Sequence, residues 1–331
     1  MKILVTGGCG FIGSNFIHFI LKSTDWGIIN IDSLTYAGNK DNLKEVENSD
    51  RYSFFQKDII NSIDIIDELK GVDYVVHFAA ESHVDRSIKD PAPFISTNVL
   101  GTQVLLETCR KLDVKKFIHI STDEVYGSIE NKKDKFSESS PMSPNSPYSA
   151  SKASGDLIVS VYNKTYGFPS IIVRPSNNFG YYQFPEKLMS LAITNLIEDL
   201  PIPIYGKGEN IREWLFVEDC CRGIYHILMA GLVGEAYNLG SGVEKRTIDI
   251  ANFILNEMGK SPDKYLRYVK DRPGHDFRYA LDSSKLRSLG WQPKISFEDG
   301  MRKTVQWYKN HPDWWKPVKM KVENQNKGFW G

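Results

Sequence analysis

The sequence has little cysteine, no excess charge of either sign and no long hydrophobic run. Its 331 residues include four cysteines, at positions 9, 109, 220 and 221, and no Cys-X-X-Cys pair. This argues against a disulfide framework and a cysteine-based zinc site. With no secretory leader recognisable, it predicts reduced thiols in a cytoplasmic protein. No apolar run approaches the roughly 20 residues of a membrane-spanning helix, so we expect a soluble protein without a membrane partner.

Charge is balanced along the chain. Lysine and arginine together number 41, as do aspartate and glutamate, and the formal net charge is zero. Such a chain has no broad cationic field for nucleic acid, so no nucleic-acid partner is expected and any anionic ligand must be bound locally. The histidines, His83 and His275 among them, have no spacing typical of metal sites, and no metal is predicted.

Hydrophobic β-branched runs alternate with amphipathic segments through the first half of the chain. Six strands are predicted, at residues 3–5, 28–32, 52–56, 74–79, 117–121 and 170–174. This alternation predicts an α/β fold with a Rossmann-type, doubly wound parallel sheet, which we assign to a dinucleotide-binding domain at residues 1–180. Residues 181–331 are predicted to form mainly a smaller C-terminal substrate-binding lobe.

Two features make the boundary between these two parts less distinct. Residues 237–240 read as a strand that can return to the main sheet, so we expect a segment near 212–240 to rejoin the first domain. Beyond Asn310 the chain is polar with isolated tryptophan and phenylalanine residues, which predicts a peripheral helix or a disordered tail.

Glycines at positions 7, 10 and 13 follow the first predicted strand, where the chain turns into an amphipathic segment. Such a turn lets the backbone and a helix N-terminus approach a pyrophosphate. Asp32 ends the second predicted strand 19 residues after Gly13, where its carboxylate can bind the adenosine ribose and repel a 2′-phosphate. We therefore predict NAD rather than NADP, with Asp58 and Ile59 beside the adenine.

Tyr148 and Lys152 are four residues apart, so on a helix they share one face. A nearby ammonium favours the phenolate, which would make Tyr148 a usable base near neutral pH. The alternative is a solvated helix face without chemistry. The dinucleotide-binding motif earlier in the chain favours the catalytic interpretation.

Thr122, Asp123 and Glu124 follow the fifth predicted strand, at the sheet edge where open α/β sheets bind ligands. Successive strand residues face opposite sides, so both carboxylates can address one substrate only if the chain has begun to turn. Burial and mutual repulsion raise one pKa and leave the other group ionised, which suits an acid and a base. The alternative is a helix N-cap with two solvated acids.

These motifs resemble the extended short-chain dehydrogenases/reductases and, more narrowly, the dTDP-glucose 4,6-dehydratase family. The resemblance extends from Met1 to about Tyr308, and it rests on residues 79–87, 122–124, 177–178, 184–188, 211–214 and 271–275. Two residues depart from the pattern. Cys9 replaces the usual alanine of the glycine loop, which is sterically mild, and Glu213 stands where aspartate is common, which keeps the charge.

The resemblance implies a hydro-lyase that uses NAD to oxidise carbon 4 of dTDP-glucose, eliminates water across carbons 5 and 6, and returns the hydride to carbon 6. Tyr148, assisted by Lys152, would take the carbon-4 hydroxyl proton while Thr122 steadies that oxygen. Glu124 would remove the carbon-5 proton, and Asp123 would protonate the leaving hydroxyl.

Further site residues are expected from the loop motif and from the resemblance. The NAD set is Gly7, Gly10, Phe11, Ile12, Gly13, Asp32, Ser33, Leu34, Thr35, Asp58, Ile59, Phe78, Ala79, Ala80, Ser82, Thr97, Tyr148, Lys152 and Asn178. The nucleotide-sugar set is Ser82, Thr122, Asn177, Lys187, Leu188, Pro203, Tyr205, Arg212, Arg272 and His275. Cationic members of the second set suit a diphosphate. A homodimer through helices near 93–109 and 148–166 is also implied.

Several alternatives stay open at this point. A UDP-glucose 4,6-dehydratase differs only in the base it selects. A nucleotide-sugar 4-epimerase shares the cofactor loop and the tyrosine and lysine pair, and a UDP-glucuronate decarboxylase would release carbon dioxide. A non-catalytic NAD-binding regulator would bind the cofactor without consuming a nucleotide sugar.

Overall fold

The computed structural model describes residues 1–129, 131, 134–271 and 276–325. Its main sheet has seven strands in the order β10-β6-β5-β4-β1-β2-β3, and every neighbouring pair is parallel. The strands are β1 (Lys2–Thr6), β2 (Gly27–Asp32), β3 (Tyr52–Gln56), β4 (Tyr74–His77), β5 (Lys116–Ile120), β6 (Ser170–Pro175) and β10 (Ala236–Leu239). The predicted Rossmann-type fold is confirmed, with one strand beyond the first six.

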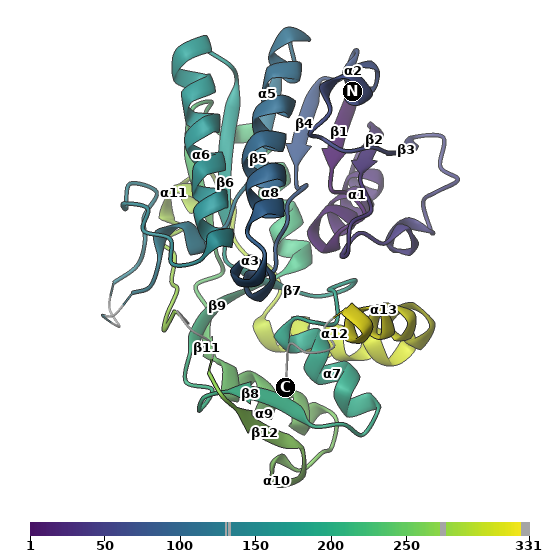
Figure 1. Cartoon of the computed structure of the whole chain (residues 1–331), viewed down its shortest axis with the longest axis vertical. Coiled ribbons are helices and arrows are strands. Elements are labelled where there is room, and N and C mark those ends of the chain that lie inside the picture. Colours follow the sequence, from purple (N-terminus) through teal and green to yellow (C-terminus); the bar gives the residue numbers. More distant parts are fainter. Residues whose placement is uncertain (130, 132–133, 272–275, 326–331) are drawn as a thin grey trace.

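Helices cover both faces of this sheet (Figure 1). On one face lie α1 (Phe11–Ser23) and α8 (Val217–Ala230), and on the other lie α2 (Ser62–Leu69), α5 (Thr102–Lys111) and α6 (Pro147–Tyr166). The strand order reverses between β1 and β4. The carboxyl ends of these two strands therefore frame the crevice in which folds of this type bind ligands.

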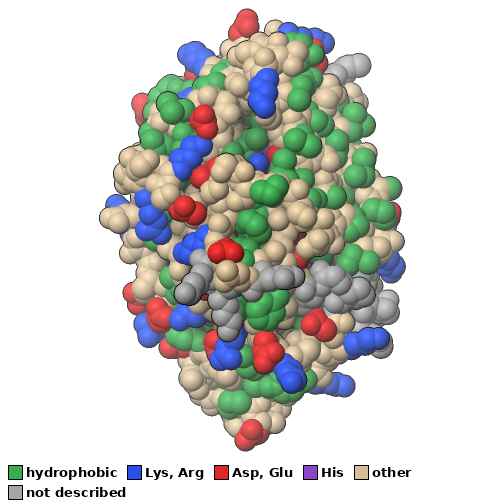
Figure 2. Space-filling view, turned by 90° about the vertical axis from the view of Figure 1, so that its left-hand side faces the viewer, with side chains coloured by type: hydrophobic (Ala, Val, Ile, Leu, Met, Phe, Trp, Pro, Cys, Tyr) green, Lys and Arg blue, Asp and Glu red, His purple; other side chains and the backbone are tan. Residues whose placement is uncertain are grey.

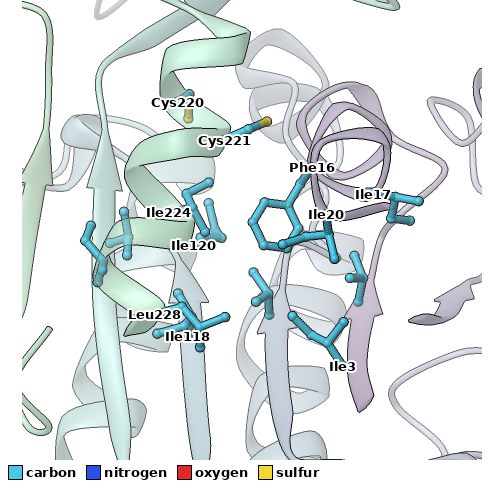
Figure 3. Close-up of a cluster of buried hydrophobic side chains, with 14 of the residues drawn as sticks. Ile3, Phe16, Ile17, Ile20, Ile118, Ile120, Cys220, Cys221, Ile224 and Leu228 are labelled. Carbon is cyan, nitrogen blue, oxygen red and sulfur yellow. The ribbon is translucent and has the colours of Figure 1, made fainter. Parts of the chain in front are cut away.

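The core beneath α1 and α8 explains why the chain returns to the main sheet. Phe16 and Ile20 of α1 and Ile224 of α8 are fully buried and face one another above the strands (Figure 3). Cys220 and Cys221 are free and buried in this cluster. The predicted return of residues 237–240 is confirmed, because β10 follows α8 and pairs with β6.

A smaller lobe is built from two short sheets and their helices. Its strands are β7 (Asn177–Phe179), β8 (Ile202–Tyr205), β9 (Ile211–Phe216), β11 (Glu244–Arg246) and β12 (Leu266–Val269), and its longer helices are α7 (Leu188–Ile197), α9 (Thr247–Glu257), α12 (Phe297–Asn310) and α13 (Pro312–Gln325). These elements enclose a second core. The domain boundary near residue 180 stays a prediction. No helix among the described residues is both long and apolar enough to cross a membrane.

The C-terminal segment beyond Asn310 forms the predicted helix, α13, as far as Gln325. The helix is less peripheral than expected, because it packs into the second core, where Trp315 is fully buried. Trp314 Nε1 also donates a hydrogen bond to Asn42 Oδ1 of the larger part at 2.8 Å. The isolated aromatic residues explain why α13 packs against the core, because burying a large aromatic side chain is favourable even in a helix that is otherwise polar.

Candidate active site

The glycine loop joins β1 to α1 by a turn that only glycine accommodates. Gly7 has φ +69°, and a Cβ atom there would lie 2.5 Å from the Ala79 nitrogen. A Cβ atom at Gly13 would lie 2.4 Å from the Gly7 carbonyl oxygen. Gly10 precedes α1 and has no side chain with which to cap it, so the first N–H groups of this helix are available to phosphate oxygens.

Asp32 connects the glycine loop to the loop after β2. Its side chain is buried, and its Oδ2 and Oδ1 accept hydrogen bonds from the backbone nitrogens of Cys9 and Leu34, at 2.9 and 2.8 Å. Burial raises the pKa of Asp32, and these two backbone hydrogen bonds oppose the rise. Burial also raises the pKa of the Cys9 thiol to about 12, so this departure from the family pattern adds no reactive group.

The strand β5 ends at Ile120, and a 3₁₀ helix, η3 (Asp123–Tyr126), begins three residues later. Thr122 caps it, because Thr122 Oγ1 accepts a hydrogen bond from the Glu124 nitrogen at 3.2 Å. This turn brings both Asp123 and Glu124 to the same cleft, as the sequence predicted. The alternative of two solvated acids is wrong for Asp123, which is only 2% exposed.

Asp123 is in an environment that favours the neutral acid. Burial raises its pKa well above the usual value, the charges of Glu124 and Glu213 raise it further, and Arg212 opposes them. Thr122 Oγ1 donates to Asp123 Oδ1 at 3.3 Å. Within the described part of the chain, Oδ2 is buried without a hydrogen-bond partner. A protonated carboxyl group here can donate its proton to a ligand.

Tyr148 and Lys152 lie at the start of α6, on its buried face. Ser146 and Ser149 form a capping box that begins the helix. The exposed fractions of Tyr148 and Lys152 are 9% and 3%, and Lys152 Nζ donates to the Ile120 carbonyl oxygen at 2.7 Å. The predicted shared face is confirmed.

The environment of Tyr148 opposes the phenolate that the sequence predicted near neutral pH. Burial raises the pKa of Tyr148, Glu124 and Asp123 raise it further, and a hydrogen bond with Thr122 opposes them. Burial also lowers the pKa of Lys152 to about 8. In the protein alone, desolvation and the Glu124 charge therefore outweigh the neighbouring ammonium, and Tyr148 holds its proton at neutral pH.

One cleft collects most of the predicted residues. Those lining it are Gly7, Gly10, Phe11, Ile12, Gly13, Asp32, Ser33, Thr35, Asp58, Ile59, Phe78, Ala79, Ala80, Ser82, Thr97, Thr122, Asp123, Glu124, Tyr148, Lys152, Asn177, Asn178 and Lys187. Of the predicted NAD set, Leu34 is the described residue outside this lining. Its contribution is the backbone N–H group that holds Asp32.

Only some residues of the predicted nucleotide-sugar set line this cleft. Its members Leu188, Pro203, Tyr205 and Arg212 belong to α7, β8 and β9 and are not among the described residues that line the cleft. Arg272 and His275 lie outside the described residues. Arg212 is nevertheless close enough to lower the pKa of Asp123, and its guanidinium lies over the Tyr279 ring at 4.4 Å.

Several lining residues were missed from the sequence. They include Tyr36, Lys57, Ser121, Ser176, Gln183, Phe184 and Glu186. Phe184 and Glu186 had a signal, since they share the motif of Lys187. Tyr36 had none, because it reaches the cleft through a loop whose path depends on contacts with Phe184 and Arg86.

The cleft has the features that a dinucleotide needs. The glycine turn leaves no room for Cβ atoms, and several buried polar atoms of lining residues, among them Ser176 Oγ, Asn177 Oδ1 and Gln183 Oε1, have no hydrogen-bond partner within the described chain. Buried polar atoms are rarely left unpaired. The residues present therefore fit a polar ligand that completes these hydrogen bonds.

The fold and site define a Rossmann-fold enzyme of the short-chain dehydrogenase/reductase type. The family model described as GDP-mannose 4,6 dehydratase matches residues 4–304. The dTDP-glucose 4,6-dehydratase of Escherichia coli is 47% identical over 96% of each chain. The chain belongs to the family of dTDP-glucose 4,6-dehydratases.

Solved structures agree with this assignment. The crystal structure of DesIV, the dTDP-glucose 4,6-dehydratase of Streptomyces venezuelae, has NAD bound; it is 47% identical, covers 96% of this chain and 100% of its own, and has a TM-score of 0.93. The UDP-glucuronic acid 4-epimerase of Bacillus cereus, also with NAD, is 33% identical over 94% of this chain and 99% of its own, with a TM-score of 0.88. The fold is therefore shared with epimerases, and the site must decide the reaction.

Proposed function

We propose that this chain is an NAD-dependent hydro-lyase that converts dTDP-glucose into dTDP-4-keto-6-deoxyglucose and water. The related proteins named above carry this activity in their names, and one of them has NAD bound. The observation that carries the proposal is the buried Asp123 beside Glu124 in the cleft that also contains Tyr148 and Lys152. Eliminating water needs a further acid and base at carbons 5 and 6, whereas a 4-epimerisation needs only the base at the carbon-4 hydroxyl.

The chemistry that bound NAD would supply is hydride transfer, from carbon 4 of the sugar and back to carbon 6. The glycine loop and the N-terminus of α1 would hold its phosphates, and Asp32 would accept the hydroxyls of its adenosine ribose. Tyr148 takes the carbon-4 hydroxyl proton after releasing its own, and the Lys152 charge favours the phenolate formed in this way. Thr122, which hydrogen-bonds Tyr148, orients that oxygen.

The elimination needs two further proton transfers. Once carbon 4 is a ketone, the carbon-5 hydrogen becomes acidic, and Glu124 removes it. Asp123 gives its proton to the carbon-6 hydroxyl, which leaves as water. A double bond then joins carbons 5 and 6. Burial raises the pKa of Asp123, which keeps that proton available at neutral pH. The two electrons taken from carbon 4 return to carbon 6 while Glu124 returns a proton to carbon 5, so the turnover is redox-neutral.

One assay tests the proposal. The purified protein is incubated with dTDP-glucose and with UDP-glucose side by side, and the products are analysed by mass. We expect a product lighter by one water from dTDP-glucose, with UDP-glucose converted more slowly. Preferential dehydration of UDP-glucose would make the chain a UDP-glucose 4,6-dehydratase. An isomer of unchanged mass would favour a 4-epimerase and contradict the proposal.

We also propose that the chain forms a cytoplasmic homodimer through α6 and the segment before α5. Hydrophobic side chains gather on the upper part of the face that contains α6 (Figure 2). The exposed apolar side chains of α6 and of the segment before α5 include Leu157 and Val161 of α6, 55% and 51% exposed, and Ile95 and Leu100 of α4 (Ala92–Ile95) and η2 (Ser96–Gly101), 52% and 47% exposed. Clustered exposed apolar residues are typical of interfaces. Leu157→Glu should convert the dimer to a monomer in analytical ultracentrifugation.

A further inference from the structure

Ionisable side chains repeat every four residues along the buried face of α6, and the third has no part in the proposed reaction. Tyr148 and Lys152 are followed by Asp156, which is 1% exposed. Residues four apart share a helix face, so the Asp156 carboxylate lies one turn beyond the Lys152 ammonium. Because a buried charge is costly unless it is paired, its partners indicate what it does.

Asp156 is fixed in place from the neighbouring strand β6. Arg174 Nε donates to Asp156 Oδ2 at 2.8 Å. Arg174 Nη1 donates to the Tyr126 hydroxyl at 2.7 Å, and that hydroxyl donates to Asn238 Oδ1 at 2.8 Å. Burial raises the pKa of Asp156, while Arg174 lowers it. A charge-assisted contact this short keeps the carboxylate ionised and links α6 to β6, η3 and β10.

The other titratable groups of this region do not supply a negative charge to Lys152. His119 of β5 has its Nε2 atom 3.5 Å from Asp156 Oδ1, and burial lowers its pKa well below the usual value. Burial likewise lowers the pKa of His77 of β4 to about 3, so both imidazoles are neutral. Arg174 of β6 is a cation, and the η3 carboxylates act mainly on Tyr148.

We propose that Asp156, held by Arg174, is a positioning residue that keeps Lys152 charged where its Nζ atom donates to the Ile120 carbonyl oxygen. This inference rests on the proposed function, because the Lys152 charge matters only if Tyr148 takes a proton. Burial lowers the pKa of Lys152 to about 8, and the Asp156 charge opposes that fall. Without Asp156, the ammonium would lose its proton at lower pH and the phenolate would lose its support.

The test measures the first chemical step alone. In a protein carrying Asp123→Asn and Glu124→Gln, the formation of bound NADH from dTDP-glucose is followed in single turnovers across pH, with and without Asp156→Asn. The rate should rise with pH up to the pKa of Lys152 and stay level above it, because Tyr148 holds its proton more tightly than Lys152 does; this level part is the alkaline limb. With Asp156→Asn the alkaline limb should begin about one pH unit lower, and the rate along it should be about tenfold lower. The amount of bound NAD should not change.

A buried aspartate elsewhere provides the matched control. Asp219 of α8 is fully buried, pairs with Arg222 and accepts backbone hydrogen bonds from Lys294 and Ile295 at 2.9 Å. Asp219→Asn should leave the alkaline limb in place. An unmoved limb in Asp156→Asn, or an equal shift in Asp219→Asn, would overturn the proposal.

A conservative variant covers the case in which Asp156→Asn does not fold. Asp156→Glu keeps the charge, so its alkaline limb should stay within about half a pH unit of the parent. A full-unit shift in Asp156→Glu would contradict the proposal. If the protein with an unaltered Asp156 forms no NADH from dTDP-glucose, and the otherwise unaltered enzyme releases no dehydrated product, the proposed function has failed and not this inference.

Discussion

Asp32 and Asp123 are two buried aspartates of one cleft, and their surroundings give them opposite properties. Asp32 accepts backbone hydrogen bonds on both carboxylate oxygens. Asp123 has a Thr122 contact on one oxygen, and its other oxygen has no partner among the residues described. Burial raises both pKa values, but backbone donors oppose the rise at Asp32, whereas Glu124 and Glu213 add to it at Asp123. Local donors and charges, and not residue type, separate a hydrogen-bond acceptor from a proton donor.

The largest effect should come from removing the acid and the base together. A protein with Asp123→Asn and Glu124→Gln should release product about 10⁴-fold more slowly, since each proton transfer contributes about 10²-fold or more. The first oxidation should survive in part, so bound NADH should accumulate in single-turnover absorbance measurements. Normal release of the 6-deoxy product would show that these two residues do not have the proposed roles.

Removing the phenol should stop the reaction one step earlier. Tyr148→Phe should reduce turnover about 10³-fold, because the carbon-4 hydroxyl then has no base. Unlike the double variant, it should accumulate no bound NADH under the same single-turnover conditions. Rapid NADH formation in Tyr148→Phe would assign the proton transfer to another group.

A substitution at Gly7 tests the part of the cleft that the glycine turn between β1 and α1 forms. Gly7→Ala would place a Cβ atom 2.5 Å from the Ala79 nitrogen at a positive φ, a strain of about 2 kcal/mol or more. We expect about a 30-fold loss of NAD affinity, measured as the NAD retained after gel filtration. Gly27→Ala is the control, since a Cβ atom there would have no atom of the described chain within 4 Å apart from its own chain neighbours. Equal retention by the two variants would contradict a cofactor role for the turn.

The smallest effect concerns stability and its dependence on pH. The pKa of Asp123 is higher in the native protein than in the unfolded chain, so the unfolded chain loses this proton at lower pH. The native protein therefore loses stability as pH rises from about 4 towards the raised pKa. Asp123→Asn does not titrate and should melt about 2 °C higher at neutral pH, with a gain that grows with pH across this window. Asp32→Asn should melt lower, because two backbone N–H groups lose their carboxylate acceptor. Calorimetry across pH checks both signs, and a lower melting temperature for Asp123→Asn would contradict this description of its environment.

The sequence predicted the features that depend on neighbouring residues. The six strands of the first half appear within two residues of their predicted ends, and the turn after β5 brings Asp123 and Glu124 to one cleft. Hydrophobic periodicity and glycine placement act over a few residues, so they can be read without knowing the fold.

Features set by distant contacts were predicted less well. The helix α13 was expected at the periphery, but Trp315 enters the second core. The pKa of Tyr148 was expected to fall beside Lys152, yet burial and the η3 carboxylates raise it. Tyr36 was not predicted to line the cleft at all. Each outcome depends on atoms that are close in space and far apart along the chain.

By itself, the sequence determined the order of strands and helices, the glycine turn and the reactive residue types, because hydrophobic spacing and steric freedom are local properties. The tertiary structure alone decided which carboxylates are buried, which oxygens meet a backbone donor and which charges oppose one another. Burial and electrostatic interactions depend on distances between separate elements, and those distances exist only once the chain has folded.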